Sequence, residues 1–283
     1  MTITRYLLVF TILARLVGPV HAQQASPGFP YELRPLRDLW VGGGALLIAG
    51  GAYGIHRAKP VYTAADFNNL NPQDVNAFDR GATRYYSVTD DHLRTGMLAA
   101  TGVAGAITLP ALIYKETPGL RSPAFWNECI VVGTIYAEGL AFNLGAAEWS
   151  KKFVDRLRPY AYNPSLSFAQ KSSQDYLSSF YSNTTALQWY TAAFIVKVVN
   201  DLYPDAGWRY YVWGGAAAYS IFQGYLGVRS GQHFPTDVIT GALIGGATGF
   251  LFPALHHRKD HRFVVVPWTK LSGSIGFYAI VHL

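Results

Sequence analysis

The sequence is poor in cysteine and in charged side chains, and each shortage excludes a class of protein. The single cysteine, Cys129, excludes an intrachain disulfide framework and a cysteine-rich metal site. Charged residues make up 14% of the 283 residues, against roughly 25% in ordinary soluble proteins. Hydrophobic residues make up 50%, with 19 Tyr and 16 Phe among them. This composition favours an unusually apolar helical protein, or one that contacts a membrane.

Acidic residues are fewer than basic ones, which gives a formal net charge of +6. An excess of positive charge favours anionic partners. The basic stripes with interleaved aromatic residues that mark nucleic-acid binders are absent from the sequence, so we expect no nucleic-acid partner.

The first 22 residues have the features of a secretory signal peptide. Arg5 supplies the positive end, Tyr6–Ala14 an apolar run, and Val20–Ala22 a small-residue cleavage pattern. The alternative is an uncleaved N-terminal anchor. In both cases we expect an exported protein, periplasmic or membrane-associated.

The remaining chain predicts an all-α protein, because six helical stretches occur without a βαβ alternation. The signal peptide (1–22) is followed by an N-terminal segment with the first helix and a polar loop (23–94), a helical core (95–258) and a short C-terminal β-like tail (259–283). The expected helices cover residues 39–55, 95–114, 125–157, 185–202, 208–226 and 238–255.

Only the stretch 95–114 reaches the roughly 20 apolar residues that a membrane-spanning helix requires. Three crossings after an exported N-terminus would also place Lys151 on the cytoplasmic side. We therefore favour a periplasmic bundle that rests against a membrane surface, with a multi-pass membrane protein as the alternative.

Three polar elements carry the candidate chemistry. Lys151 and Arg158 lie seven residues apart, so on a continuous helix both cations project from one face and form a plausible phosphate clamp. Ser182, Asn183 and Thr184 precede an apolar helix, whose N-terminal N–H groups favour anions. Each element alone is more often an ordinary helix end or cap than a binding site.

The third element is the pair His233 and Asp237, four residues apart as a helix begins at Pro235. An aspartate one turn away can accept a hydrogen bond from one ring nitrogen, which leaves the other as a nucleophile. Such pairs are commonly structural, so the argument for a site rests on the order of all three elements.

Together the three stretches resemble the motifs of the type 2 phosphatidic acid phosphatase (PAP2) superfamily, which includes vanadium haloperoxidases. Lys151, Arg158 and Pro159 match the first motif, and His233 and Asp237 match the third. The resemblance implies a six-helix PAP2-type bundle.

The chain departs from the family pattern at two positions. The second motif, Pro-Ser-Gly-His, is here Tyr181 to Thr184: Ser182 is kept, Asn183 stands for glycine and Thr184 for histidine. In the third motif the expected arginine is Gly227. Arg229 lies two residues later, which turns it about 200° around a helix axis, so it is not counted as a replacement.

The resemblance implies that His233 attacks phosphorus to form a phosphohistidine, that Asp237 orients it, and that Lys151, Arg158 and Ser182 hold the phosphoryl oxygens. No metal or cofactor is expected for this reaction. Thr184 cannot replace imidazole as the acid, and the loss of general-acid catalysis costs about 10²–10⁴-fold. A lipid phosphate or, better, a prenyl diphosphate is then the expected substrate, because a phosphate leaving group needs little acid.

Two other interpretations stay open from the sequence. The chain is alternatively a non-catalytic envelope homologue that binds an anionic lipid, since two family positions are lost. It is alternatively a terpene-cyclase-like enzyme that ionises an allylic diphosphate without attack by histidine. An imidazole distant in sequence, such as that of His92, could also lie beside Ser182 in the fold and replace the missing acid.

Overall fold

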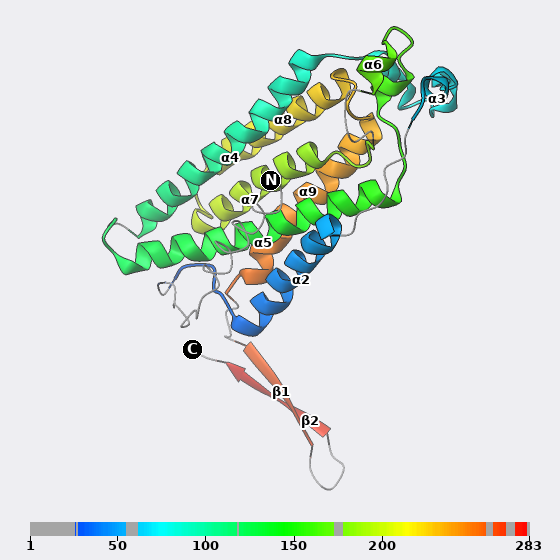
Figure 1. Ribbon diagram of the computed structural model, residues 1–283. Coiled ribbons are helices and arrows are strands. Elements are labelled where there is room, and N and C mark those ends of the chain that lie inside the picture. The colour runs from blue at the N-terminus through cyan, green and yellow to red at the C-terminus, as the bar shows by residue number, and fades with distance from the viewer. Residues whose placement is uncertain are drawn as a thin grey trace.

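The computed structural model describes most of the chain after the expected signal peptide (Figure 1). The described residues are 26, 28–54, 62–117, 119–172 and 178–258, with the backbone of 263–269 and 275–281. The expected signal peptide lies outside the described residues.

Six long helices form the bundle, which confirms the all-α fold. They are α2 (Pro35–Gly54), α4 (Val88–Glu116), α5 (Pro123–Phe153), α7 (Asn183–Leu202), α8 (Arg209–Arg229) and α9 (Pro235–His256). Two short helices, α3 (Ala64–Asn68) and α6 (Phe168–Lys171), and three 3-10 turns (Pro72–Asp74, Arg80–Arg84 and Pro159–Tyr162) lie in the connecting segments.

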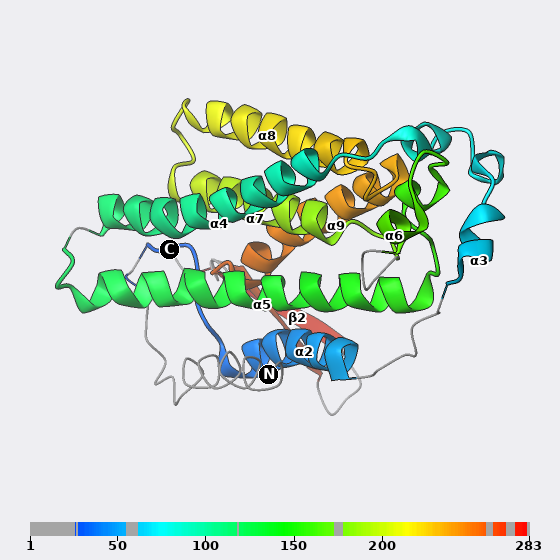
Figure 2. The ribbon, with the colours of Figure 1, turned by 45° about the horizontal axis from the view of Figure 1, so that its top comes forward.

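Helix α7 occupies the middle of the bundle and packs against α4, α5, α8 and α9 (Figure 2). Its most extensive contact is with α9, which carries Gly241, Gly245 and Gly249 at four-residue spacing. A Cβ at Gly245 would lie 2.0 Å from the backbone oxygen of Ala186, so only glycine permits this approach of the two helices. The outer helix α2 packs against α5.

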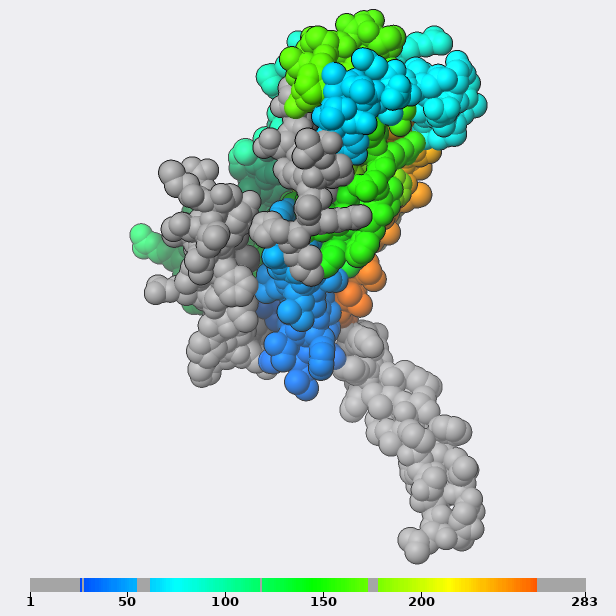
Figure 3. Space-filling view, turned by 45° about the vertical axis from the view of Figure 1, so that its right-hand side comes forward, coloured from blue at the N-terminus to red at the C-terminus, as the bar shows by residue number. Residues whose placement is uncertain are grey.

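One end of the bundle gathers the termini of five long helices (Figures 1 and 2). The beginnings of α4, α7 and α9 and the ends of α5 and α8 lie there. The segments 62–87 and 159–172, with α3 and α6, cover this end, where they form the top of the space-filling view (Figure 3). The three motif stretches belong to these termini, so the fold brings them together.

Three predicted helix limits are wrong by four residues or more. Helix α2 begins at Pro35 rather than at residue 39. Helix α4 begins at Val88 rather than near residue 95, because Ser87 caps it and Asp90 and Asp91 complement the helix dipole in its first turn. Helix α5 ends at Phe153 rather than near residue 157. The proline at 159 favours an extended conformation for the residue before it, and the chain from Val154 onward is no longer helical.

The C-terminal tail contains β1 (Phe263–Thr269) and β2 (Ile275–Val281), which pair antiparallel with Phe263 opposite Val281. This agrees with the two short strands expected there.

Three described helices, α4, α5 and α9, are long and apolar enough to cross a membrane. The prediction that one stretch alone reaches this length is therefore wrong; it undercounted because α5 and α9 carry isolated polar residues among apolar ones. Large apolar side chains also lie exposed on the outer faces of several helices, among them Trp40, Leu47, Ile107, Phe222 and Leu243. These features indicate an association with membrane.

Candidate functional site

His233 lies in the turn between α8 and α9 and is buried, with 3% of its surface exposed. Its Nδ1 lies 2.9 Å from the backbone oxygen of Ser179. Because a carbonyl oxygen only accepts, Nδ1 must carry the proton in this contact. The lone pair of the neutral ring is then on Nε2, the atom that would act as a nucleophile.

The surroundings of His233 keep its imidazole neutral. Burial is the largest cause that lowers its pKa well below the ordinary value, followed by the positive charges of Arg94, Arg158 and Lys151. Three cations from three different segments therefore lie close enough to act on one imidazole. A neutral ring beside several cations is suited to attack on an anionic phosphoryl group.

Asp237 does not orient His233 by a hydrogen bond, contrary to the prediction. Its Oδ2 is 3.9 Å from Nδ1 of His233 and instead accepts from the backbone N–H of Phe234 at 2.8 Å. Its Oδ1 accepts from Arg156 at 2.6 Å. The carbonyl of Ser179 takes the role of fixing the imidazole, because the 178–182 segment passes directly beside the ring.

Arg156 is a central side chain of the site that the sequence argument missed. It donates to Asp79 at 2.6 Å as well as to Asp237, and both carboxylates are fully buried. Asp79 also accepts from the backbone N–H of Thr236 at 3.0 Å. This network ties the 72–84 segment and the chain after α5 to the first turn of α9, and so holds His233 in place.

Lys151 lies at the end of the predicted helix, whereas Arg158 does not. Lys151 lies in the last turn of α5, where its Nζ contacts Oε1 of Glu148 at 2.9 Å. Arg158 comes from the non-helical segment after α5 and is partly buried, and this loss of solvent lowers its pKa. It donates to the side-chain oxygen of Gln232, while its Nε has no acceptor among the described residues. A donor of this kind is available to an anionic ligand.

The second motif forms the N-terminus of α7. Ser182 is fully buried and caps the helix: its Oγ accepts from the N–H of Thr185 and donates to the Thr185 hydroxyl at 2.9 Å. Asn183 and Thr184 are the first two helical residues, and the N–H groups at such positions have no partner within the helix. In this arrangement the Ser182 hydroxyl is occupied, and the helix amides are the donors that remain.

Gly227 lies in the last turn of α8, next to both His233 and Arg94. A Cβ at this position would be 3.8 Å from Cδ of Arg94 and 4.0 Å from Cδ2 of His233. Arg94 comes from α4 and is 6% exposed. The sequence argument placed residue 94 in a polar loop and did not consider it; the cap formed by Ser87 was the available signal for a helix there.

No second imidazole lies near His233 in the part of the chain that the structure describes. His92 is exposed on α4 and two residues from Arg94, so it points about 200° away around the helix. His256 and His257 lie at the opposite end of α9, about 30 Å along a 22-residue helix. The described residues also contain no group of three side chains able to hold a metal ion.

The fold and these contacts define a helical bundle with a buried imidazole and several cations at one end, an arrangement whose charge suits an oxyanion. Comparisons with known proteins give the same class. Residues 132–260 match the family model of the PAP2 superfamily, which confirms the resemblance over this segment. The segment contains Lys151, Arg158, Ser182, Gly227 and His233 but not Arg94.

Among solved structures, the chain is similar to a transmembrane PAP2-type phosphatidylglycerolphosphate phosphatase from Bacillus subtilis. The identity is 16%, the TM-score is 0.44, and the match covers 77% of this chain and 94% of that one. The search of curated proteins found no match.

Proposed function

We propose that this protein is an exported, membrane-associated hydrolase that removes a phosphoryl group from a lipid diphosphate, such as a prenyl diphosphate, through a phosphohistidine at His233. The observation that carries the proposal is a neutral, buried imidazole whose Nδ1 is held by the Ser179 carbonyl while Arg94, Arg158 and Lys151 act on the ring.

In the proposed reaction Nε2 of His233 attacks the terminal phosphorus, and the bond to the bridging oxygen breaks. The lipid monophosphate leaves with that oxygen and its electron pair. Water then attacks the phosphohistidine, releases inorganic phosphate and restores the neutral ring. Lys151, Arg158 and the first amides of α7 would hold the phosphoryl oxygens.

The preference for a diphosphate follows from the missing acid. Thr184 stands where the family has histidine, and the other imidazoles of the described residues lie elsewhere. A simple alkoxide leaves poorly without a proton, whereas a phosphate is already a stable anion. Absence of general-acid help therefore costs a phosphomonoester of an alcohol the most, about 10²–10⁴-fold.

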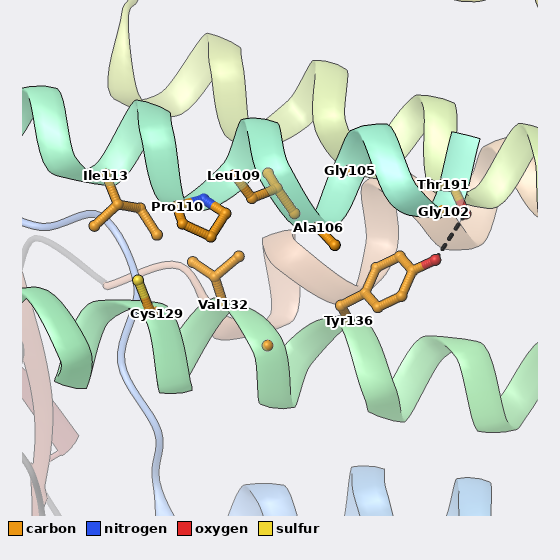
Figure 4. Close-up of a pocket in the computed structure, with 11 residues that line it drawn as sticks. Gly102, Gly105, Ala106, Leu109, Pro110, Ile113, Cys129, Val132, Tyr136 and Thr191 are labelled. Atoms are coloured by element: carbon orange, nitrogen blue, oxygen red, sulfur yellow. Dashed lines mark hydrogen bonds between the residues drawn. The ribbon is translucent and has the colours of Figure 1, made fainter. Parts of the chain in front are cut away.

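An apolar cavity supports a hydrocarbon chain on the substrate (Figure 4). It has a volume of about 190 Å³ and lies between α4 and α5, with the wall of α7 behind it. Leu109, Pro110 and Ile113 line it from α4, while Val132 does so from α5. Helix α4 also carries Arg94. Gly102, which lines the end of the cavity nearest the site, lies eight residues after Arg94, or about 12 Å of helix rise.

Purified full-length protein in detergent should hydrolyse farnesyl diphosphate at least about 100-fold faster, as kcat/KM, than phosphatidic acid. His233→Ala should abolish turnover and should also remove the acid-labile, base-stable phosphoenzyme trapped after rapid quenching. Phosphatidic acid as the better substrate would contradict the choice of a diphosphate.

The same experiment separates the other two functions. Tight binding of farnesyl diphosphate without release of phosphate would support an envelope protein that binds an anionic lipid. Hydrocarbon products with free diphosphate would support ionisation of the substrate. The exported location is tested by protease treatment of spheroplasts, where full protection of the 159–179 segment would contradict it.

A further inference from the structure

Arg94 and Gly227 form a pair in space although 133 positions separate them in the chain. Residue 227 is where the family pattern expects an arginine, and here it has no side chain. The side chain of Arg94 passes 3.8 Å from the place a Cβ would take at 227. The space beside His233 that an arginine at 227 would need is thus already bordered by an arginine from α4.

The bonding of Arg94 leaves one nitrogen for a ligand. Its Nε and Nη2 contact the same oxygen of Asp91, at 2.7 and 2.6 Å. Its Nη1 is buried and has no acceptor among the described residues. A buried donor without a partner is unfavourable, so such a nitrogen favours a ligand that supplies the acceptor missing among the described residues. Asp91 holds the guanidinium so that this nitrogen stays in the site.

Arg158 presents the matching feature from the segment after α5. Its Nε is buried and likewise has no acceptor in the described ranges, and loss of solvent together with the charge of Arg94 lowers its pKa. Asp91 pairs with Arg94, and Asp91 and Asp237 offset part of the positive charge around Arg158. Each guanidinium group still holds one buried nitrogen without an acceptor among the described residues, and the phosphoryl oxygens of a substrate would accept from both.

We propose that Arg94 is a phosphate-binding residue that replaces, from a different helix, the arginine missing at 227, and that Gly227 provides the room for it. This inference rests on the proposed function only in that the site must bind a phosphoryl group. Turnover is not required, so the two can fail separately.

The test measures binding of inorganic phosphate to the full-length protein in detergent by titration calorimetry. Arg94→Ala should weaken binding about 10- to 100-fold, the value of one charge-assisted hydrogen bond of about 1.5–3 kcal/mol. Arg94→Gln keeps most of the side-chain volume and should show a similar loss; it replaces the alanine variant if that variant fails to fold.

The reciprocal substitution makes the test specific. Gly227→Arg should weaken phosphate binding, because two guanidinium groups then compete for one space. The double variant Arg94→Ala/Gly227→Arg should recover most of the affinity. Gly227→Ala should bind as the wild type does, since its Cβ meets its neighbours at ordinary contact distances.

Arg229→Ala is the matched control, because this arginine lies in the same turn of α8 but is half-exposed and pairs with Asp90. Its phosphate affinity should not change. Unchanged affinity in both Arg94 variants, or a wild-type protein that does not bind phosphate, would overturn the inference. A wild type that binds phosphate but hydrolyses no lipid diphosphate would refute the hydrolase and leave the role of Arg94 intact.

Discussion

At the residue scale, the site works through the state of one imidazole. Nδ1 of His233 donates to a backbone carbonyl, so the tautomer does not depend on the protonation of a carboxylate. The nearest carboxylate, that of Asp237, is 3.9 Å away and is engaged by Arg156. His233 is therefore oriented by the main chain, while Asp237 anchors the beginning of α9.

The depressed pKa of His233 predicts activity that persists into acid. In the proposed reaction the nucleophile is the neutral ring, so its protonation should lower kcat/KM when the pH drops through the lowered pKa, well below the ordinary imidazole value near 6.5. The measurement is kcat/KM for farnesyl diphosphate from pH 4 to 9. An acid limb centred at or above pH 6.5 would contradict the burial and charge described for this ring.

Lys151→Met provides the internal comparison for that profile. Lys151 is one of the charges that lower the pKa of His233. Its removal should therefore shift the acid limb toward higher pH, in addition to any loss of rate. A limb that does not move would mean that Lys151 lies too far from the ring to act on it.

At the element scale, the centre of the bundle depends on the close contact of α7 with α9. Three glycines of α9 face α7: Gly241, Gly245 and Gly249. A Cβ at any of them would lie 2.0 to 2.6 Å from an atom of α7 or its N-cap. The contact sets the distance between Ser182 at the start of α7 and His233 just before α9. The backbone N–H of Ser182 also donates to the backbone oxygen of Asp237 at 3.1 Å, which joins the two helix beginnings.

Substitution of two neighbouring glycines of α9 by alanine should change the free energy of unfolding in opposite directions. Gly245→Ala should destabilise the protein by about 1–3 kcal/mol or more, because the new methyl group meets the Ala186 oxygen. Gly246→Ala meets open space and should be neutral or stabilising by up to about 1 kcal/mol, from helix propensity. Thermal unfolding in the same detergent measures both. Equal shifts would show that the α7–α9 contact is looser than described.

The sequence predicted the helices better than their ends, and the ends decide the site. Apolar stretches located all six long helices, because apolar composition is a property of the whole element. The end of α5 was missed because Pro159 acts directly only on the residue before it, whereas the extended chain from Val154 also pairs through Leu157 with Ser178, a contact from another part of the chain. The predicted common helix face for Lys151 and Arg158 failed for the same reason.

The sequence predicted the site residues that belong to a motif. It did not predict the residues that reach the site only through the packing of the helices. The stretches holding Lys151, Arg158 and His233 follow a fixed spacing, so the resemblance was sufficient to select them. Arg94 has no fixed spacing from Gly227 in the sequence. The space beside Gly227 is known only from the packing of α4 against α8. The replacement of Asp237 by the Ser179 carbonyl is a backbone contact, which no pattern of side chains encodes.

At the scale of the whole molecule, the bundle separates a polar end from an apolar body. The cations and His233 lie where five helix termini meet, whereas the cavity between α4 and α5 begins about 12 Å further along α4. The end of the cavity nearest the site is bounded by Tyr136, whose hydroxyl forms a 2.9 Å hydrogen bond with Thr191 (Figure 4). A substrate with a charged head and an apolar chain matches this division.

Filling the cavity should therefore affect long substrates alone. Gly133 lines it from α5, and a Cβ there meets open space, so Gly133→Leu should fold normally. Displacement of two methylene groups costs about 1.6 kcal/mol, which raises KM for farnesyl diphosphate about tenfold. KM for a short diphosphate such as isopentenyl diphosphate should stay the same.

Gly214→Leu is the control for the cavity, because Gly214 also faces open space but lies on α8, away from the lining residues. It should leave both KM values unchanged. An equal rise in KM for short and long substrates in Gly133→Leu would place the hydrocarbon chain elsewhere.

The glycine at 227 has a consequence for how this chain can change over generations. If Arg94 fills the gap as proposed, a single change to the arginine of the family pattern at 227 brings two bulky cations into the same volume. Restoration then needs two coordinated replacements, of which either one alone is harmful. A glycine at 227 is therefore easy to keep, and a return to the arginine of the family pattern is difficult.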